Sequence, residues 1–141
     1  MGLLSESDRR ATQDRLRAME RPVRLVHFTQ ELECPSCPET KRLLQQVVEL
    51  SDKLSLEIYS FQLDREKVAQ YQIDKVPATV IEGEKDDGIR FYGLPSGYEF
   101  ATLLEGVVAV SRGRSELNPA TVDRLRALDR PLHLQVFVTP T

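Results

Sequence analysis

Apolar and polar residues alternate in two segments of the first half of the chain, and each segment predicts a strand. Residues 23–29 alternate loosely and contain Val, Phe and Thr, which favour strands. Residues 54–63 alternate with a period of two, so their apolar side chains lie on one face. Between them, residues 40–54 carry apolar side chains at helical spacing. Residues 8–20 are mostly charged and predict a short, mostly exposed helix that ends before Pro22.

The next part of the chain predicts a short helix and two strands. Asp64 is placed to cap a helix that ends at Tyr71. Residues 78–82 predict a strand, and after a turn at residues 83–88 the segment 89–92 predicts the strand that returns beside it.

A last helix completes the pattern. It begins after Ser96, which is a candidate N-cap, and ends near Val110, with Gly113 just past its end, where glycine is common. The order is helix, strand, helix, strand, helix, strand, strand, helix. Strands that alternate with helices predict right-handed crossovers and parallel pairing, whereas the last two strands predict an antiparallel hairpin. We therefore expect an α/β protein with a mixed central sheet and helices on both faces.

The end of the chain repeats its beginning. Residues 121–137 match residues 12–28 at a fixed offset, with ten of 17 positions identical. A match of this kind is typical of a duplicated unit. We therefore expect residues 1–112 to form one complete domain. Residues 113–141 would contribute a linker and then the helix and strand that open an incomplete second unit.

Composition and charge narrow the range of partners. The 141 residues are 40% hydrophobic and 29% charged, an ordinary balance for a soluble domain. Aromatic residues make up only 6%, Trp is absent and the net charge is −3, which argues against a nucleic-acid partner. No apolar run approaches the roughly 18 residues of a membrane span, and the N-terminus lacks the pattern of a signal peptide. These features predict a cytoplasmic protein with no membrane partner.

The candidate chemistry lies in one short motif, Cys34-Pro35-Ser36-Cys37. Two cysteines three residues apart at the start of a helix place their sulfurs about one turn apart, close enough for a disulfide. The free N–H groups and the dipole of a helix N-terminus stabilise a thiolate, which is the reactive form. We expect Cys34 to be the exposed attacking thiol and Cys37 to be the more buried resolving thiol, one turn into the helix. Pro35 suits the first turn.

The charges beside the motif leave the reactivity of Cys34 open. Glu31, Glu33 and Glu39 flank the pair, and nearby carboxylates disfavour a thiolate. The helix N-terminus favours it by about 0.3–1 kcal/mol at an exposed site. The sequence does not decide which effect is larger.

Two other interpretations of the motif remain. A zinc site would need two more ligands, and the histidines are His27 and His133, one in each copy of the repeated strand. The cysteines could also be unreactive core residues. A C-x-x-C pair within a cytosolic β-α-β pattern favours a redox pair without a metal. His27 fits a strand residue better than a catalytic base.

Residues 22–111 resemble the thioredoxin-fold superfamily. The resemblance rests on the first strand, the C-x-x-C helix, the second strand, and Val76-Pro77 leading into the hairpin and last helix. It implies a three-layer α/β/α fold with a mixed four-stranded sheet, here with an extra N-terminal helix. It also implies that Pro77 is cis beside the cysteines and that the main chain of Val76 pairs with an extended substrate. Pro35 and Ser36 complete the implied substrate-binding residues.

A narrower resemblance covers residues 90–100 and the start of the second unit. Both are similar to the tandem, glutaredoxin-like protein disulfide oxidoreductases of thermophiles and to the duplicated N-terminal domain of the alkyl hydroperoxide reductase flavoprotein. This implies an oxidoreductase that uses a Cys34–Cys37 disulfide to reduce, form or exchange disulfides in protein substrates, with no cofactor beyond that disulfide. Electrons would come from a flavin-dependent partner of the thioredoxin-reductase type. The second unit departs from the family pattern because its C-P-x-C is absent.

Two alternative functions stand beside this one. The Ser96-Gly97 start of the last helix could bind a glutathione carboxylate through its N–H groups, as in a glutaredoxin, although a plain helix cap explains it as well. The chain could instead be a non-catalytic, partner-binding or dimerising fragment. An unpaired strand at residues 132–138 can pair with its own domain or with a second copy in a homodimer.

Overall fold

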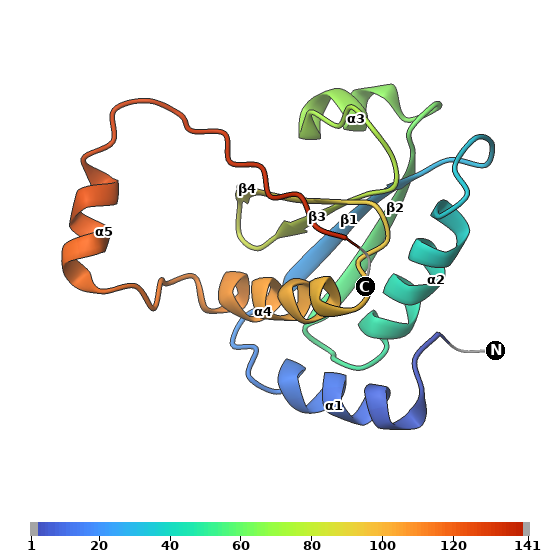
Figure 1. The fold of residues 1–141 in the computed structure, drawn as a ribbon, viewed down its shortest axis with the longest axis horizontal. Helices are drawn as coiled ribbons and strands as arrows, with labels where there is room; N and C mark the ends of the chain where they lie inside the picture. Colours follow the sequence, from blue (N-terminus) through green and yellow to red (C-terminus); the bar gives the residue numbers. More distant parts are fainter. Residues whose placement is uncertain (1–2, 140–141) are drawn as a thin grey trace.

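Strand-forming segments at four places in the chain pair into one mixed sheet. The computed structural model describes residues 3–139, and within them the strand order is β2-β1-β3-β4 (Figure 1). In chain order the elements are α1 (Glu6–Leu16), β1 (Val23–Thr29), α2 (Cys37–Val48), β2 (Leu54–Ser60), α3 (Arg65–Tyr71), β3 (Ala78–Glu82), β4 (Asp86–Tyr92), α4 (Tyr98–Arg112) and α5 (Pro119–Arg126).

The pairing of the strands confirms the expected mixed sheet. β1 is parallel to β2, with Val23 opposite Leu54, and antiparallel to β3, with Phe28 opposite Ala78. β3 and β4 form the antiparallel hairpin, which has a register shift between Val80 and Glu82. β4 begins three residues earlier than expected, because its pairing with β3 extends to Asp86.

Helices cover both faces of the sheet and make three layers. On one face, Leu25 and Ile81 join a core cluster with buried residues of α1, α2 and α4. On the other face, Val26, Phe28 and Val80 pack with residues of α3. Because side chains alternate along a strand, β1 supplies both clusters from successive residues. The thioredoxin-like α/β/α architecture is therefore confirmed.

The N-terminal helix is mostly exposed, as its charged sequence predicts. Ser5 and Asp8 form a reciprocal capping box, so α1 begins at Glu6. It ends at Leu16, four residues before the expected end. Thr12, Leu16 and the following Met19 are buried. Three apolar or small side chains on one face are therefore enough to dock α1 onto the core.

Two predicted caps are wrong in detail. Asp64 stands at the N-cap position of α3, but its carboxylate accepts a hydrogen bond from the Ser60 N–H at 2.6 Å, and β2 ends at Ser60. The N-cap of α4 is Gly97, at a positive φ of 62°, and Ser96 makes no capping bond. Gly113 does end α4 in the left-handed conformation, as expected.

The C-terminal segment forms the expected helix but not the expected strand. Asn118 caps α5 through a hydrogen bond from the Ala120 N–H at 2.8 Å. Residues 132–138 have no strand pairing, which corrects the expectation of a strand. The first copy of this strand pairs with neighbours on both sides, and residues 3–139 supply no such neighbours to the second copy. In the described part of the chain, no residue from 113 onward is buried.

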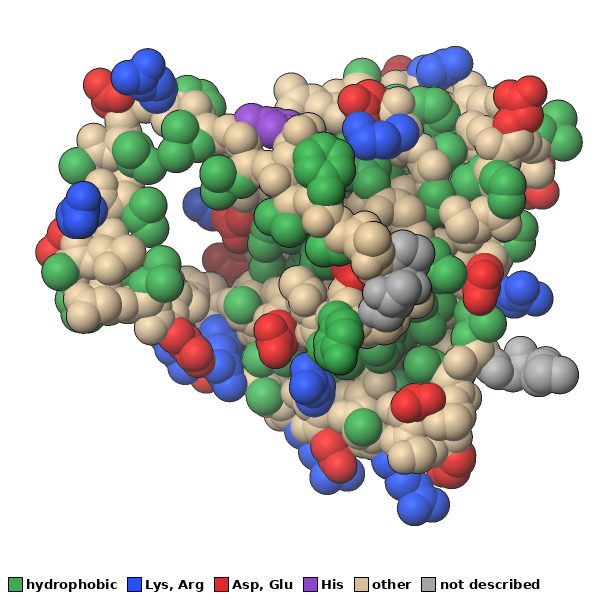
Figure 2. Space-filling view, viewed as in Figure 1, with side chains coloured by type: hydrophobic (Ala, Val, Ile, Leu, Met, Phe, Trp, Pro, Cys, Tyr) green, Lys and Arg blue, Asp and Glu red, His purple; other side chains and the backbone are tan. Residues whose placement is uncertain are grey.

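α5 projects from the rest of the molecule, and the chain after it turns back toward the sheet (Figure 1), where the charge of His133 acts on Asp74. In the space-filling view, an arm formed by α5 and the residues after it carries hydrophobic side chains that face open space (Figure 2). Within residues 3–139, no helix is long and apolar enough to cross a membrane.

Candidate active site

Cys34 and Cys37 form a disulfide at the start of α2. Their Cα atoms are 5.4 Å apart, within the range that a disulfide needs. α2 begins at Cys37, with Ser36 as its N-cap residue. The Cys37 N–H donates to the Cys34 carbonyl at 3.2 Å, so the two cysteines close a turn that leads directly into the helix.

The prolines of this segment are arranged differently from the expectation. Pro38, not Pro35, lies in the first turn of α2. Pro35 lies in the preceding turn, between the two cysteines. Thr40 holds the start of the helix, because both its N–H and its hydroxyl donate to the Ser36 carbonyl, at 3.0 and 2.7 Å. Cys37 is therefore the first helical residue rather than a residue one turn inside.

The two sulfur-bearing residues differ in exposure in the expected order. Cys34 is 9% exposed, and Cys37 is fully buried. Cys34 is thus a buried residue with the disulfide formed, which corrects the expectation of an exposed thiol. It is still the residue of the pair that solvent can reach.

The loop before β3 lies near the end of β1, from which the chain leads to the cysteine turn. The Val76–Pro77 peptide bond is cis, as the resemblance implied. Because Ala78 pairs with Phe28 near the end of β1, Pro77 lies next to the point where the chain leaves β1 for the cysteine turn. The Pro77 carbonyl accepts from the Gly93 N–H at 2.9 Å, whereas the N–H and carbonyl of half-buried Val76 have no partner among the described residues.

Charged and aromatic side chains line the same loop. Lys75 pairs with Asp74 at 2.8 Å and lies over the Tyr92 ring, 4.4 Å from its centroid. The hydrogen bond to Asp74 raises the pKa of Lys75. This arrangement was not expected from the sequence, because it depends on the register that brings the end of β4 beside residue 75.

A small hollow separates the start of α2 from the loop before α4. It has a volume of about 300 Å³, and Glu39, Leu43, Ser96 and Gly97 are among its lining residues. Asp8 adds a second carboxylate to its wall. Burial raises the pKa of Glu99, in the first turn of α4. The N-terminus of α4 therefore lies beside a hollow lined by the carboxylates of Asp8 and Glu39.

His27 is a fully buried residue of β1, which agrees with its expected place in a strand. Its Nδ1 lies 3.1 Å from the Thr79 hydroxyl, and its Nε2 has no hydrogen-bond partner among the described residues. Burial lowers the pKa of His27 to about 4, a hydrogen bond to the Ala78 backbone opposes this effect, and the charge of Lys41 adds to it. Within residues 3–139, no three His, Cys, Asp or Glu side chains are grouped to hold a metal ion.

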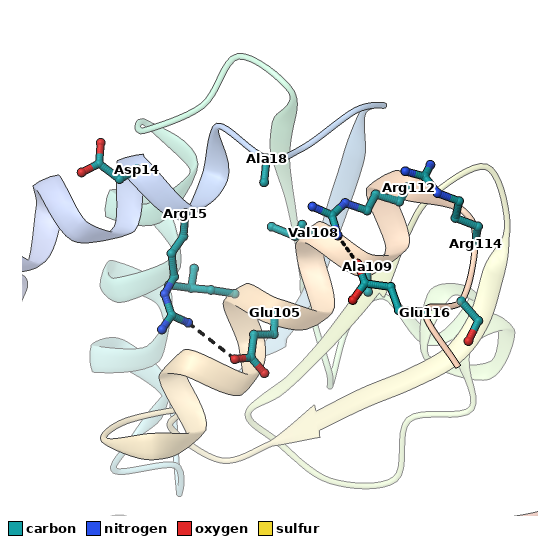
Figure 3. Close-up of a pocket in the computed structure, with 11 residues that line it drawn as sticks. Asp14, Arg15, Ala18, Glu105, Val108, Ala109, Arg112, Arg114 and Glu116 are labelled. Carbon is teal, nitrogen blue, oxygen red and sulfur yellow. Dashed lines mark hydrogen bonds and ion pairs between the residues drawn. The ribbon is translucent and has the colours of Figure 1, made fainter. Parts of the chain in front are cut away.

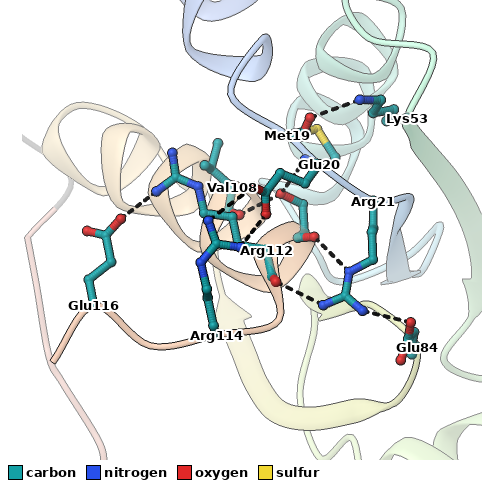
Figure 4. A network of polar contacts seen from close by, with 10 residues as sticks. Met19, Glu20, Arg21, Lys53, Glu84, Val108, Arg112, Arg114 and Glu116 are labelled. Carbon is teal, nitrogen blue, oxygen red and sulfur yellow. Dashed lines mark hydrogen bonds and ion pairs between the residues drawn. The ribbon is translucent and has the colours of Figure 1, made fainter. Parts of the chain in front are cut away.

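A larger cavity has no cysteine in its lining. It has a volume of about 640 Å³ between α1, α4 and the segment after α4, with Arg15 and Glu105 paired across it (Figure 3). Beside it, a polar network fixes the end of α4 (Figure 4). Arg21 donates to the Ser111 and Arg112 carbonyls and pairs with Glu84, while Arg114 binds Glu20 through two hydrogen bonds. These contacts satisfy the helix end, which is a structural role.

The fold and the paired cysteines place the chain among the thioredoxin-like proteins. The model of the thioredoxin domain family matches residues 26–105, more than half of the chain. The chain therefore belongs to the thioredoxin domain family. An alkyl hydroperoxide reductase component from Staphylococcus epidermidis is 25% identical over 104 residues, which are 73% of this chain and 18% of that protein.

Solved structures agree with this assignment. A protein disulfide oxidoreductase from Aeropyrum pernix superposes with a TM-score of 0.79 and 29% identity, over 88% of this chain and 55% of that one. The NTD_N/C domain of alkylhydroperoxide reductase AhpF from Enterococcus faecalis gives a TM-score of 0.80 and 25% identity, over 90% and 62%. The chain thus spans little more than half of these structures and about a fifth of its curated relative.

Proposed function

We propose that the protein is a thiol–disulfide oxidoreductase that acts on disulfides in other proteins. The observation that carries this proposal is the Cys34–Cys37 disulfide at the N-terminus of α2, in which Cys34 keeps 9% of its surface exposed and Cys37 none. The similarity to a protein disulfide oxidoreductase supports it.

In the proposed reaction, the Cys34 thiolate attacks a substrate disulfide and forms a mixed disulfide. The free N–H groups at the start of α2 favour that thiolate. Cys37 then attacks the Cys34 sulfur, which restores the Cys34–Cys37 disulfide and releases the substrate as a dithiol. The reverse sequence oxidises a dithiol, and the relative reduction potentials decide the direction. Pro35 and Ser36, between the two cysteines, would contact the substrate and tune the potential.

Variants of the two cysteines test this mechanism. Cys34→Ser should reduce an insulin-type disulfide at no more than the background rate, because the attacking sulfur is absent. Cys37→Ser should instead accumulate mixed disulfides, which mass spectrometry detects as added mass that a reductant removes. Normal turnover by Cys34→Ser would contradict the assignment of Cys34, and equal trapping by both variants would contradict the division of roles.

The backbone of Val76 supplies a binding site for an extended substrate. Its unpaired N–H and carbonyl lie beside Pro77, and pairing with a substrate strand would add main-chain hydrogen bonds. A set of disulfide peptides, each N-methylated at one residue, tests this. Methylation at the residue that pairs with Val76 should raise KM roughly two- to tenfold, the value of about one hydrogen bond. Methylation of the next residue, whose N–H points away, is the control, and equal effects at both positions would contradict the pairing.

A flavin-dependent reductase remains the proposed electron source. The similarity to the alkyl hydroperoxide reductase component supports a partner of this class. A cytoplasmic location also remains an expectation.

A glutathione-linked reaction is the weaker alternative. Glu39 and Asp8 line the hollow at the start of α4, and they would repel a glutathione carboxylate there. We therefore expect little glutathione-dependent turnover of a mixed-disulfide substrate. Saturable turnover at physiological glutathione, together with failure on protein disulfides, would favour the glutaredoxin function.

The division at residue 112 and the homodimer remain proposals about the C-terminal segment. The apolar side chains of residues 132–138 are exposed, with Leu134 and Phe137 nearly 90% exposed, and this supports an association in which they are covered. The segment would then act as an interaction element beside the catalytic domain.

A further inference from the structure

A buried histidine nitrogen without a partner requires an explanation. Most buried polar atoms are hydrogen-bonded, so each exception points to a strained, catalytic or state-dependent group. In His27, Nδ1 is occupied by the Thr79 hydroxyl and Nε2 has no partner among the described residues, while the residue has no exposed surface. This describes the protein with its disulfide formed.

The lengths and directions of β1 and α2 imply that His27 lies at the level of Cys37. His27 shares a strand face with Val23 and Leu25, which pack in the same core cluster as Val47 of α2. From Val23 to His27 a strand advances about 13 Å. From Val47 back to Cys37 a helix covers about 15 Å. Because α2 runs opposite to β1 before returning the chain to β2, Cys37 lies over the His27 end of the strand.

An electrostatic contact supports this placement. The charge of Lys41 acts on His27, and Lys41 lies one helical turn after Cys37, on the same side of α2. Burial keeps the His27 ring neutral near pH 7, since its pKa is about 4. We assign the ring proton to Nδ1, the nitrogen 3.1 Å from the Thr79 hydroxyl, where its N–H also serves the hydrogen bond to the Ala78 backbone, so that Nε2 is a free acceptor.

We propose that His27 sets the redox balance of the cysteine pair by forming a hydrogen bond with Cys37 only in the dithiol state. The inference rests on the proposed function, because it concerns the same pair. A disulfide sulfur carries no proton, whereas the Cys37 thiol carries one and can donate it to Nε2. Reduction by two glutathione molecules breaks the Cys34–Cys37 bond, leaves one proton on each sulfur and produces glutathione disulfide. The buried nitrogen gains its partner in that step, which favours the reduced form.

A redox titration against glutathione tests the proposal, with the dithiol fraction measured by alkylation and mass spectrometry. His27→Phe removes the nitrogen, so the equilibrium should shift three- to tenfold toward the disulfide, about 14 to 30 mV more reducing. His27→Gln places an amide oxygen near the position of Nε2 and should recover most of the shift. Leu25→Val is the control, because it trims the neighbouring buried residue on the same face without touching a polar atom.

A shift of less than twofold in a folded His27→Phe protein would overturn the proposal, as would an equal shift in Leu25→Val. If His27→Phe does not fold, the ¹⁵N chemical shift of Nε2 in the wild-type protein decides. It should change on reduction, and an unchanged value would overturn the hydrogen bond. A pair that shows these shifts but reduces no protein disulfide would contradict the proposed function and leave the role of His27 standing.

Discussion

At the residue scale, the site depends on which atoms are covered and which are not. Cys37 and His27 are both fully buried, and Cys34 keeps a small exposed area. The spacing of the cysteines was enough to predict their disulfide. Two other contacts could not be predicted, because they join residues far apart in the sequence: Lys75 over Tyr92, and His27 beside Thr79. Both depend on strand register, which hydrophobic alternation leaves undetermined.

The burial of His27 predicts a loss of stability in acid. Between about pH 6.5 and 4, the unfolded chain protonates His27 and the folded protein does not, so stability falls as the pH falls through this window. A fall in the pKa of His27 from 6.5 to about 4 on folding corresponds to a loss of roughly 3 kcal/mol in the free energy of unfolding once the pH reaches 4. Urea unfolding of wild type and His27→Gln at several pH values measures the difference. The variant should lack this slope.

The exposed histidine provides the control for that experiment. His133 lies in the C-terminal segment, so His133→Gln should keep the wild-type slope. Parallel curves for wild type and His27→Gln between pH 4 and 6.5 would show that His27 is not held neutral by burial.

At the element scale, hydrophobic patterns predicted the bounds of two strands but not those of every element. β1 and β3 have the predicted bounds, because each is a short run of buried, strand-forming residues. The start of α4 was misplaced by one residue, because Gly97 caps it with a positive φ that Ser96 cannot easily adopt. The extent of β4 was also missed, since it depends on pairing with β3 rather than on its own polar sequence.

The end of α4 offers a test of one cap. Gly113 has a φ of 66°, and a Cβ there would meet the Arg21 guanidinium, which binds the last carbonyls of the helix. Gly113→Ala should therefore cost about 1 kcal/mol for the backbone and more for displacing Arg21. Thermal unfolding should show a fall in Tm of at least several degrees.

A second glycine separates the backbone cost of a positive φ from the cost of displacing Arg21. Gly88 has a φ of 90° with open space around it, so Gly88→Ala should show the backbone cost alone. In an Arg21→Ala background, Gly113→Ala should lose its excess cost. An excess that persists there would mean that Arg21 does not explain it.

At the scale of the whole molecule, the same sequence pattern occurs in two environments. Leu16 is 2% exposed in α1, whereas its repeat partner Leu125 in α5 is 49% exposed. The repeat was visible in the sequence and predicted α5. It could not predict that the second strand stays unpaired, because a strand needs partners that the repeat does not contain.

Removal of the C-terminal segment is therefore expected to leave the thioredoxin-like domain intact. A chain that stops after Glu116 keeps the Arg114–Glu20 contact and loses no buried residue of the described structure. Its free energy of unfolding should match wild type within about 0.5 kcal/mol, the usual range for surface changes. Sedimentation at dilute concentration gives the second readout: wild type should dimerise and the shortened chain should not. A monomeric wild type would contradict the proposed homodimer.

The unequal covering of the two cysteines has a consequence for oxidative damage. In the dithiol state, a peroxide molecule from solvent would meet Cys34, which keeps 9% of its surface exposed, before the fully buried Cys37, so the first product of oxidation would be a sulfenic acid on Cys34. The neighbouring Cys37 thiol can condense with it and expel water, which regenerates the disulfide before the sulfur reaches an irreversible oxidation state. The burial of Cys37 thus keeps its thiol reduced, so that it can reverse the oxidation of Cys34.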